Sequence, residues 1–113
     1  MDIFQEKSYA FALRVVRLSE YLNNEKKEFI LSKKILDSGT NIGLLIEEGK
    51  QGESRVDFIQ KYSVANIRGV QNKFLVTAAA RFAESSQAES LLADCEELQK
   101  LLISALKTAR KSE

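Results

Sequence analysis

The sequence contains no histidine, no proline and no tryptophan, and it has a single cysteine among its 113 residues. Without histidine, Ser-His-Asp and Cys-His catalytic sites, histidine-based zinc sites and Glu-x-x-His di-iron sites are all excluded. The single cysteine, Cys95, excludes an intrachain disulfide and fits a reducing compartment. We therefore expect no catalytic residues, no metal ion and no cofactor.

Residues that break a backbone are scarce, with five glycines and no proline. A β-sandwich would need a turn signal roughly every ten residues, whereas long helices need none. No apolar run approaches the ~18 residues that span a membrane, and the N-terminus lacks the basic and apolar stretches of a secretion signal. We expect a cytoplasmic, all-α protein without a membrane segment, and one domain over residues 1–113.

Apolar residues recur at helical spacing in four segments: about 2–21, about 25–48, 54 to about 84, and a last one ending near 110. The connections between them are short, which makes neighbouring helices antiparallel. The sequence thus predicts an antiparallel up-down four-helix bundle. The rows expected to face its core are Phe4, Phe11, Val15, Leu18 and Leu22; Leu31, Ile35, Ser38, Ile42 and Ile46; Phe58, Tyr62, Ala65, Gly69 and Val76; Leu91, Cys95, Leu98, Leu102, Ala105 and Ala109.

Helix ends are predicted from capping residues. Asn23-Asn24 breaks the first apolar pattern, and either residue suits the cap of the second helix. Gly49 is a good C-terminal cap for that helix. The third helix is expected to start at Ser54, where Ser54 and Asp57 form an S-x-x-D capping box, and a turn is expected at 85–86.

Two glycines, Gly39 and Gly43, fall inside the second helix, where each costs about 1 kcal/mol relative to alanine. Either the helix breaks there, or the glycines let another helix approach closely. Close approach is favoured because Ile35, Ile42 and Ile46 stay in phase across them.

The first and third helices each carry a second apolar row, although one apolar face is enough for a helix of a monomeric bundle. We interpret these rows as a surface for self-association. The alternative is a broad core stripe with scattered surface apolar residues. The candidate interface residues are Tyr9, Leu13, Val16, Val56, Ile67, Val70 and Phe74.

Two blocks between residues 28 and 76 carry a resemblance to a known family. They read LSKKILDSGTNIGLLIEEG over 31–49 and SRVDFIQKYSVA over 54–65. In order, spacing and the SGTxIG core, they resemble the four-helix-bundle 23S rRNA intervening-sequence proteins, relatives of the accessory variability protein of diversity-generating retroelements. The sequence departs from the family pattern at Lys34, Asp37 and Leu45. It is also neutral or basic over 67–74, where the family tends to be acidic.

The resemblance implies a bacterial bundle protein with no known enzymatic activity, and a helix that continues through Ser38–Gly43. It also implies a ring-shaped homo-oligomer, commonly a pentamer. The accessory-protein branch binds a reverse transcriptase and nucleic acid through a basic surface. Contacts that the family makes through the departing positions cannot be carried over to this chain.

Basic residues suggest a phosphate-binding surface, although the net charge is only +1. The third helix is basic, and the lysines of the second lie in its first half, which opposes the helix dipole. A solvated lysine surface is the alternative interpretation. The candidate nucleic-acid contacts are Arg14, Arg17, Lys26, Lys27, Lys33, Lys34, Arg55, Lys61 and Arg68.

Nothing in the sequence favours catalysis. Cys95 falls on the apolar row of the fourth helix, as a packed thiol does, and the pairs at 47–48 and 96–97 consist of adjacent residues that point ~100° apart on a helix. The leading hypothesis is a non-catalytic oligomeric scaffold that binds RNA or a nucleic-acid-processing partner. The alternative is a protein–protein interaction module with no nucleic-acid role.

Overall fold

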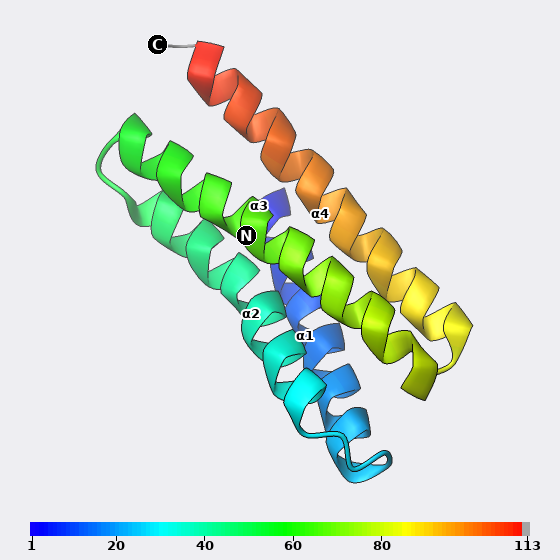
Figure 1. Ribbon diagram of the computed structural model, residues 1–113. Coiled ribbons are helices and arrows are strands. Elements are labelled where there is room, and N and C mark those ends of the chain that lie inside the picture. Colours follow the sequence, from blue (N-terminus) through cyan, green and yellow to red (C-terminus); the bar gives the residue numbers. More distant parts are fainter. Residues whose placement is uncertain (112–113) are drawn as a thin grey trace.

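The computed structural model describes residues 1–111 as four long helices and one short 3-10 segment (Figure 1). The elements are α1 (Ile3–Asn24), α2 (Ile30–Gln51), α3 (Arg55–Ala79), η1 (Ala80–Phe82) and α4 (Ser85–Lys111). They run alternately up and down in an elongated bundle of 48 × 22 × 21 Å. The predicted all-α, antiparallel four-helix bundle is confirmed.

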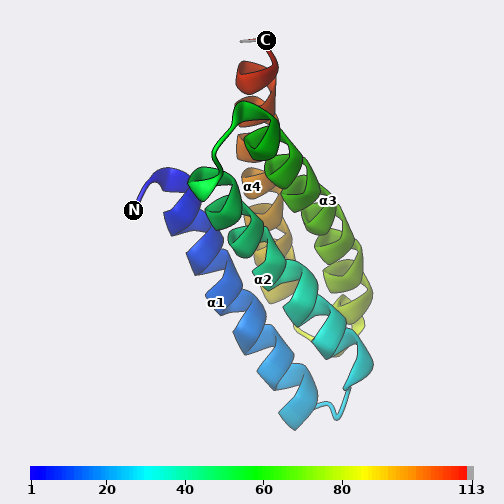
Figure 2. The same ribbon diagram turned by 90° about the vertical axis from the view of Figure 1, so that its left-hand side faces the viewer.

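The α1–α2 and α3–α4 connections lie at one end of the bundle, which we call the two-loop end (residues 25–29 and 80–84). The α2–α3 connection lies at the other end (Figure 2). Around the bundle, α2 packs against α1 and α3, and α3 packs against α4, whereas α1 contacts α4 only loosely. Helices α1 and α3 are therefore diagonal partners whose outer faces point to opposite sides.

The core is built from the predicted rows. Their most buried members come from all four helices and include Phe11, Ile35, Tyr62 and Leu102. The last turns of α4 differ from the prediction, because Leu106 is buried while Ala105 and Ala109 are only half-buried. A leucine reaches the centre of the bundle where an alanine of the neighbouring row does not.

The predicted cap between α1 and α2 is wrong. Helix α1 continues through Asn24, and α2 begins only at Ile30. The carboxylate of Glu28 takes the capping role: Oε2 accepts hydrogen bonds from the backbone N–H groups of Leu31 (2.7 Å) and Ser32 (3.2 Å). Lys27 reverses the chain with a left-handed φ of 53°. A carboxylate near a helix N-terminus also interacts favourably with the helix dipole, which explains why it serves in place of asparagine.

The ends around α3 are partly as predicted. Ser54 caps α3, and its Oγ accepts a hydrogen bond from the N–H of Asp57 at 3.1 Å. Gly49 does not end α2, which continues to Gln51 and is capped by Gly52. Gly49 is buried against Tyr62, and a Cβ there would lie 2.9 Å from the Tyr62 ring. The turn expected at 85–86 is supplied instead by η1, and α4 begins at Ser85.

The close approach predicted for the α2 glycines holds at one of them. A Cβ on Gly39 would lie 2.7 Å from both methyl carbons of Val15 and 3.0 Å from Nδ2 of Asn72. A Cβ on Gly43 would lie 3.6 Å from Oγ of Ser8, which is ordinary van der Waals contact. Helix α2 is continuous across both, so only Gly39 is fixed by the packing of α1 and α3.

A polar group lies beside Gly39 at the centre of the bundle. Asn72 of α3 has no exposed surface, and its Nδ2 donates to the carbonyl of Ile35 (3.1 Å) and to Oγ of Ser38 (3.0 Å). These bonds join α3 to α2 in a fixed register, because a buried donor without an acceptor costs about 1–3 kcal/mol.

Candidate functional site

The two candidate interface rows lie on the outside of the bundle. We name them the α1 row (Tyr9, Leu13, Val16) and the α3 row (Val56, Ile67, Val70, Phe74). Phe74 is 75% exposed, Val70 is 55% exposed and Tyr9 is 58% exposed, whereas Val16 is half-buried. Since α1 and α3 are diagonal partners, the two rows lie on helices at opposite corners of the bundle.

The exposed acids are distributed differently on the two helices that carry the rows. Glu6 and Glu20 are exposed and flank the α1 row along its helix. Helix α3 has one acidic residue, Asp57, at its start. Arg68 of α3 and Arg81 of η1 make no ion pair within residues 1–111. The Nε of Arg68 is buried without a hydrogen-bond partner in that same part of the chain.

A groove of roughly 630 Å³ runs between α2 and α3 beside the α3 row. Val70 and Phe74 form part of its apolar wall, and Lys34, Asp37 and Arg68 add charge to its rim. The apolar residues of α3 are therefore part of a hollowed surface rather than isolated side chains on a convex face. A hollow of this kind fits the side of another helix.

Several of the candidate nucleic-acid residues are engaged within the chain. Arg14 pairs with Asp94 at 2.5 Å, and Lys61 pairs with Glu48 at 3.1 Å. Arg68 donates to Oε1 of Gln71 at 2.8 Å. The two ion pairs lower the net positive charge that Arg14 and Lys61 offer to a phosphate, whereas Arg68 keeps its charge.

The other candidates lie mainly toward the two-loop end. Arg17, Lys27, Lys33 and Lys34 make no ion pair within residues 1–111. The ammonium of Lys26 lies 5.9 Å from the centroid of the Tyr21 ring. Arg55 lies apart from this group, as the first residue of α3 at the opposite end. The structure thus gathers five of the nine sequence candidates around one end of the bundle.

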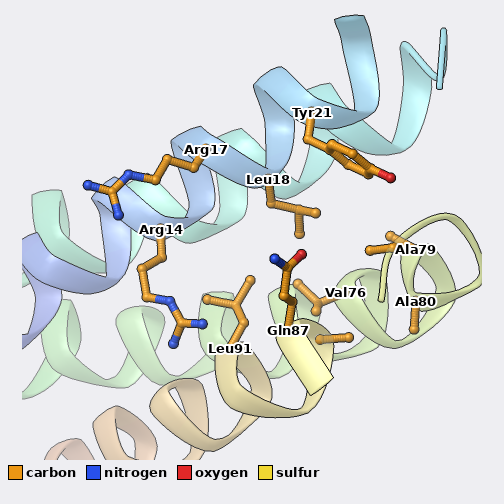
Figure 3. Close-up of a pocket in the computed structure, with 11 residues that line it drawn as sticks. Arg14, Arg17, Leu18, Tyr21, Val76, Ala79, Ala80, Gln87 and Leu91 are labelled. Atoms are coloured by element: carbon orange, nitrogen blue, oxygen red, sulfur yellow. The ribbon is translucent and has the colours of Figure 1, made fainter. Parts of the chain in front are cut away.

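A second groove, the α1–α4 groove, opens beside the two-loop end with a volume of roughly 340 Å³ (Figure 3). Its floor is apolar and rich in alanine, and Arg17, Tyr21 and Gln87 bring polar atoms to its walls. The groove exists because α1 and α4 pack loosely there and short side chains do not fill the space. Its lining comprises Arg14, Arg17, Leu18, Tyr21, Val76, Ala79, Ala80, Ala83, Gln87, Ala88 and Leu91.

Sequence reasoning found two members of this lining, Arg14 and Arg17, as part of a basic surface. It missed Tyr21 and Gln87, which stand on different helices and share no spacing pattern. Only the fold brings these two side chains to one groove.

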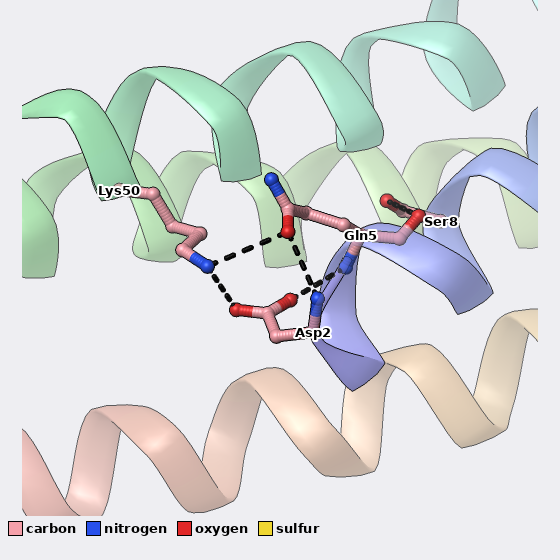
Figure 4. Close-up of polar contacts among 4 residues, drawn as sticks. All are labelled: Asp2, Gln5, Ser8 and Lys50. Atoms are coloured by element: carbon pink, nitrogen blue, oxygen red, sulfur yellow. Dashed lines mark hydrogen bonds and ion pairs between the residues drawn. The ribbon is translucent and has the colours of Figure 1, made fainter.

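At the opposite end, a polar network ties the start of α1 to the end of α2 (Figure 4). Oδ1 of Asp2 accepts from the N–H of Gln5, and Oε1 of Gln5 accepts from the N–H of Asp2, both at 2.9 Å. Lys50 forms an ion pair with Asp2. The hydrogen bonds from Lys50 and Gln5 hold the pKa of Asp2 below its ordinary value. The D-x-x-Q spacing of residues 2–5 is the sequence signal of this capping box.

The side chains considered for catalysis take part in packing and in an ion pair. Burial raises the pKa of the Cys95 thiol to about 11, and its Sγ lies 3.3 Å from the carbonyl of Gly69. Glu96 pairs with Lys73 at 2.8 Å, and the hydrogen bond from that lysine lowers the pKa of Glu96. At neutral pH the thiol is therefore protonated and Glu96 is ionised. Within residues 1–111, no three histidine, cysteine or acidic side chains come together as metal ligands would.

Comparison with known proteins identifies the family. The sequence profile of the 23S rRNA-intervening sequence protein family matches residues 2–104. The chain belongs to this family. No helix among the described residues of this family member is long and apolar enough to cross a bilayer.

A solved structure agrees with this assignment. The chain is similar to a protein of unknown function from the S23 ribosomal protein family of Bacteroides thetaiotaomicron VPI-5482, with 41% identity and a TM-score of 0.91. The match covers 93% of this chain and 99% of that one. No curated protein matches the chain. Neither the family description nor that of the solved structure names a catalytic activity.

Proposed function

We propose that this protein is a non-catalytic scaffold that assembles head to tail, α1 row against α3 row, and binds RNA or a nucleic-acid-processing partner. The observation that carries the assembly is the placement of two exposed apolar rows on diagonal helices. A surface that pairs with a different surface of the next copy forms a ring where the rotation between copies closes, and an open filament where it does not. A pentamer is the closure that the family resemblance implies.

Charge supports the pairing of unlike faces. Glu6 and Glu20 lie 14 residues apart on α1, or ~21 Å along a helix axis. Arg68 and Arg81 lie 13 residues apart, or ~20 Å at the same rise. Glu6 and Glu20 can pair with Arg68 and Arg81 when unlike rows meet, whereas two α1 rows would bring these acids together.

The assembly is tested by measuring mass with multi-angle light scattering. Val70→Glu and Phe74→Glu place a charge in the α3 row and should yield monomers with unchanged helical content. Leu44→Glu is the matched control, because Leu44 is 56% exposed on α2 and belongs to neither row. A monomeric wild type, or dissociation by the control as well, would remove the assembly from the proposal.

Mixing variants tests the head-to-tail arrangement. Leu13→Glu blocks the α1 row and Phe74→Glu blocks the α3 row, so each variant alone should be monomeric. Together they retain one intact row each and should form a one-to-one dimer. If the assembly used like faces, one of the two variants would remain fully assembled on its own, and mixing would add nothing.

The RNA partner is supported by cations that are not neutralised within residues 1–111, above all Arg17, Lys27, Lys33 and Lys34. A ring repeats this set once per subunit, so that modest local charge becomes a multivalent surface. The proposal includes a cytoplasmic location, where structured RNA is available. It includes no catalytic step, in keeping with the protonated state of Cys95 and the ion pair of Glu96.

Titration with structured RNA at ~50 and ~200 mM salt tests this part. Phosphate contacts release counterions, so binding through several lysines and arginines should be tight at the lower salt and fall by orders of magnitude at the higher. Replacing Lys33 and Lys34 by glutamine should weaken binding and flatten the salt dependence. An RNA affinity that is the same at both salt concentrations would contradict a phosphate-contacting scaffold.

A protein-interaction module without a nucleic-acid role is the second candidate. It is favoured by two large apolar side chains at the two-loop end, Phe29 (61% exposed) and Ile30 (69% exposed), which would suit a protein partner. If no RNA binds even at ~50 mM salt, this candidate leads, and the assembly remains a separate result.

A further inference from the structure

We infer that the α1–α4 groove is a site for one nucleotide, which inserts its base along the alanine floor and places its phosphate at Arg17. The inference rests on the proposed function where the nucleotide belongs to an RNA chain. A free nucleotide offers the same base and phosphate, and the experiment below separates the two sources.

The size and shape of the groove suit a flat ring. Its volume of roughly 340 Å³ falls within the ~300–1,000 Å³ of small-ligand sites. Ala79, Ala80 and Ala83 contribute only methyl groups to the lining, so a planar face can approach the backbone. Figure 3 shows Tyr21 on the α1 side of the groove and Ala79 and Ala80 on the other side. Bases stack on such rings irrespective of sequence, because every base has a π-face.

Charge and hydrogen-bonding groups at the walls identify the ligand more closely. Arg17 makes no ion pair within residues 1–111, and a guanidinium binds phosphate oxygens through two N–H groups. Lys26, above the Tyr21 ring, adds positive charge, and no acidic residue lines the groove.

Gln87 favours a nucleotide over a simple hydrophobic anion. Its amide offers both a donor and an acceptor, as the edge of a base requires. An alkyl carboxylate would use the apolar floor and the arginine but neither the amide nor the aromatic wall. The combination of aromatic ring, amide and guanidinium at one groove is what points to a base with a phosphate.

The groove should select single-stranded RNA. A base held on the alanine floor must leave its stack and its pairing partner, which costs free energy in a duplex and little in a single strand. Tyr21→Leu should therefore weaken binding of an unpaired oligonucleotide and leave binding of a duplex through the lysines of α2 unchanged.

The test measures anisotropy of a labelled ten-residue oligouridylate on the assembled protein at ~100 mM salt. Arg17→Gln and Tyr21→Leu should each weaken binding by about tenfold, from loss of a charged hydrogen bond or of base stacking. Lys107→Gln and Phe29→Leu are matched controls, because both side chains are exposed and lie outside the groove lining. We expect the controls to change affinity by less than about threefold.

Photo-crosslinking gives a readout that does not depend on variants. An oligonucleotide carrying 4-thiouridine should cross-link to the tryptic peptide 18–26, which contains Tyr21. A second arm uses free uridine monophosphate, followed by calorimetry on wild type and Arg17→Gln.

The outcomes separate this inference from the proposed function. If oligouridylate binds but groove variants and controls behave alike, or the cross-link maps elsewhere, the groove site is wrong while RNA binding stands. If no RNA binds but uridine monophosphate does so through Arg17, the RNA role is wrong and the groove is a free-nucleotide site. If neither ligand binds, both are wrong.

Discussion

The α2–α3 and α1–α4 seams of this bundle differ in how closely their two helices pack. At the α2–α3 seam a buried asparagine joins two helices, and glycines 39 and 49 leave no room for a side-chain carbon. At the α1–α4 seam the helices contact each other loosely, two exposed ion pairs bridge them, and a groove remains between them. An ion pair, Lys61–Glu48, also bridges the first seam, so the two seams differ in how closely they pack rather than in charge.

This difference teaches where the molecule can accommodate a ligand. An atom added to a close-packed seam displaces its neighbours and strains them, because protein interiors are as dense as organic crystals. A seam held by surface ion pairs gives up little free energy when it opens or fills. The candidate ligand site lies in the second kind of seam, whereas the first kind sets the register of the fold.

The largest expected effect comes from the α2–α3 seam. Asn72→Asp replaces a donor by a carboxylate that faces the Ile35 carbonyl, and it should destabilise the fold by about 3 kcal/mol or more at pH 7. Burial raises the pKa of such a carboxyl, so the loss should shrink as the pH falls and the group is protonated. Urea unfolding measures it, and Gln71→Glu on the exposed side of α3 should stay within about 0.5 kcal/mol. If the two variants lost equal amounts of stability, the burial of Asn72 would not account for the loss.

The second-largest change in stability is expected at Gly39, and it contrasts with the change expected at Gly43 of the same helix. Gly39→Leu should cost about 1–3 kcal/mol by overpacking against Val15 and Asn72. Gly43→Ala should instead raise stability by up to ~1 kcal/mol, because the added methyl makes ordinary contact and alanine favours the helix. The melting temperatures of the two variants measure whether stability falls for Gly39→Leu and rises for Gly43→Ala. A more stable Gly39→Leu would refute the close approach.

A smaller effect is expected at the α1–α4 seam. Arg14→Gln removes the pair with Asp94, whose side chains are 32% and 44% exposed, and should cost no more than about 1 kcal/mol. The cost should fade in ~1 M salt, where charges are screened within ~3 Å. A double-mutant cycle with Asp94→Asn isolates the pair. A coupling that persists at high salt would mean that this seam, too, is held by packing.

The smallest effect concerns pH and the cap of α1. The pKa of Asp2 is lowered from 3.8 by Lys50 and Gln5, so its carboxylate stabilises the fold above that pH. This contribution, below about 1 kcal/mol, should disappear as the pH falls through the folded pKa. Wild type and Asp2→Asn should therefore differ in stability near pH 7 and converge near pH 2. A difference that persists at pH 2 would assign the effect to the hydrogen bonds alone.

The sequence by itself determined the four helices, their antiparallel order and most of the core. Apolar spacing carries that information, since a helix must bury a stripe at a period of 3.6. The same spacing exposed the surplus rows, and the SGTxIG block located the close contact at Gly39. It did not determine that Glu28 caps α2 or that Gly49 lies inside a helix. Capping depends on which side chain reaches the free N–H groups, and close contact depends on which helix lies opposite.

Only the tertiary structure decided which charges are free for a partner and where a cavity remains. Arg14 and Arg17 look alike in sequence, yet one pairs with Asp94 from 80 residues away and the other makes no ion pair within residues 1–111. Tyr21 and Gln87 become neighbours of one groove because α1 and α4 meet at the two-loop end. Helical periodicity is a local property of the chain. The pairing of distant charges and the space left between helices arise from how those helices pack.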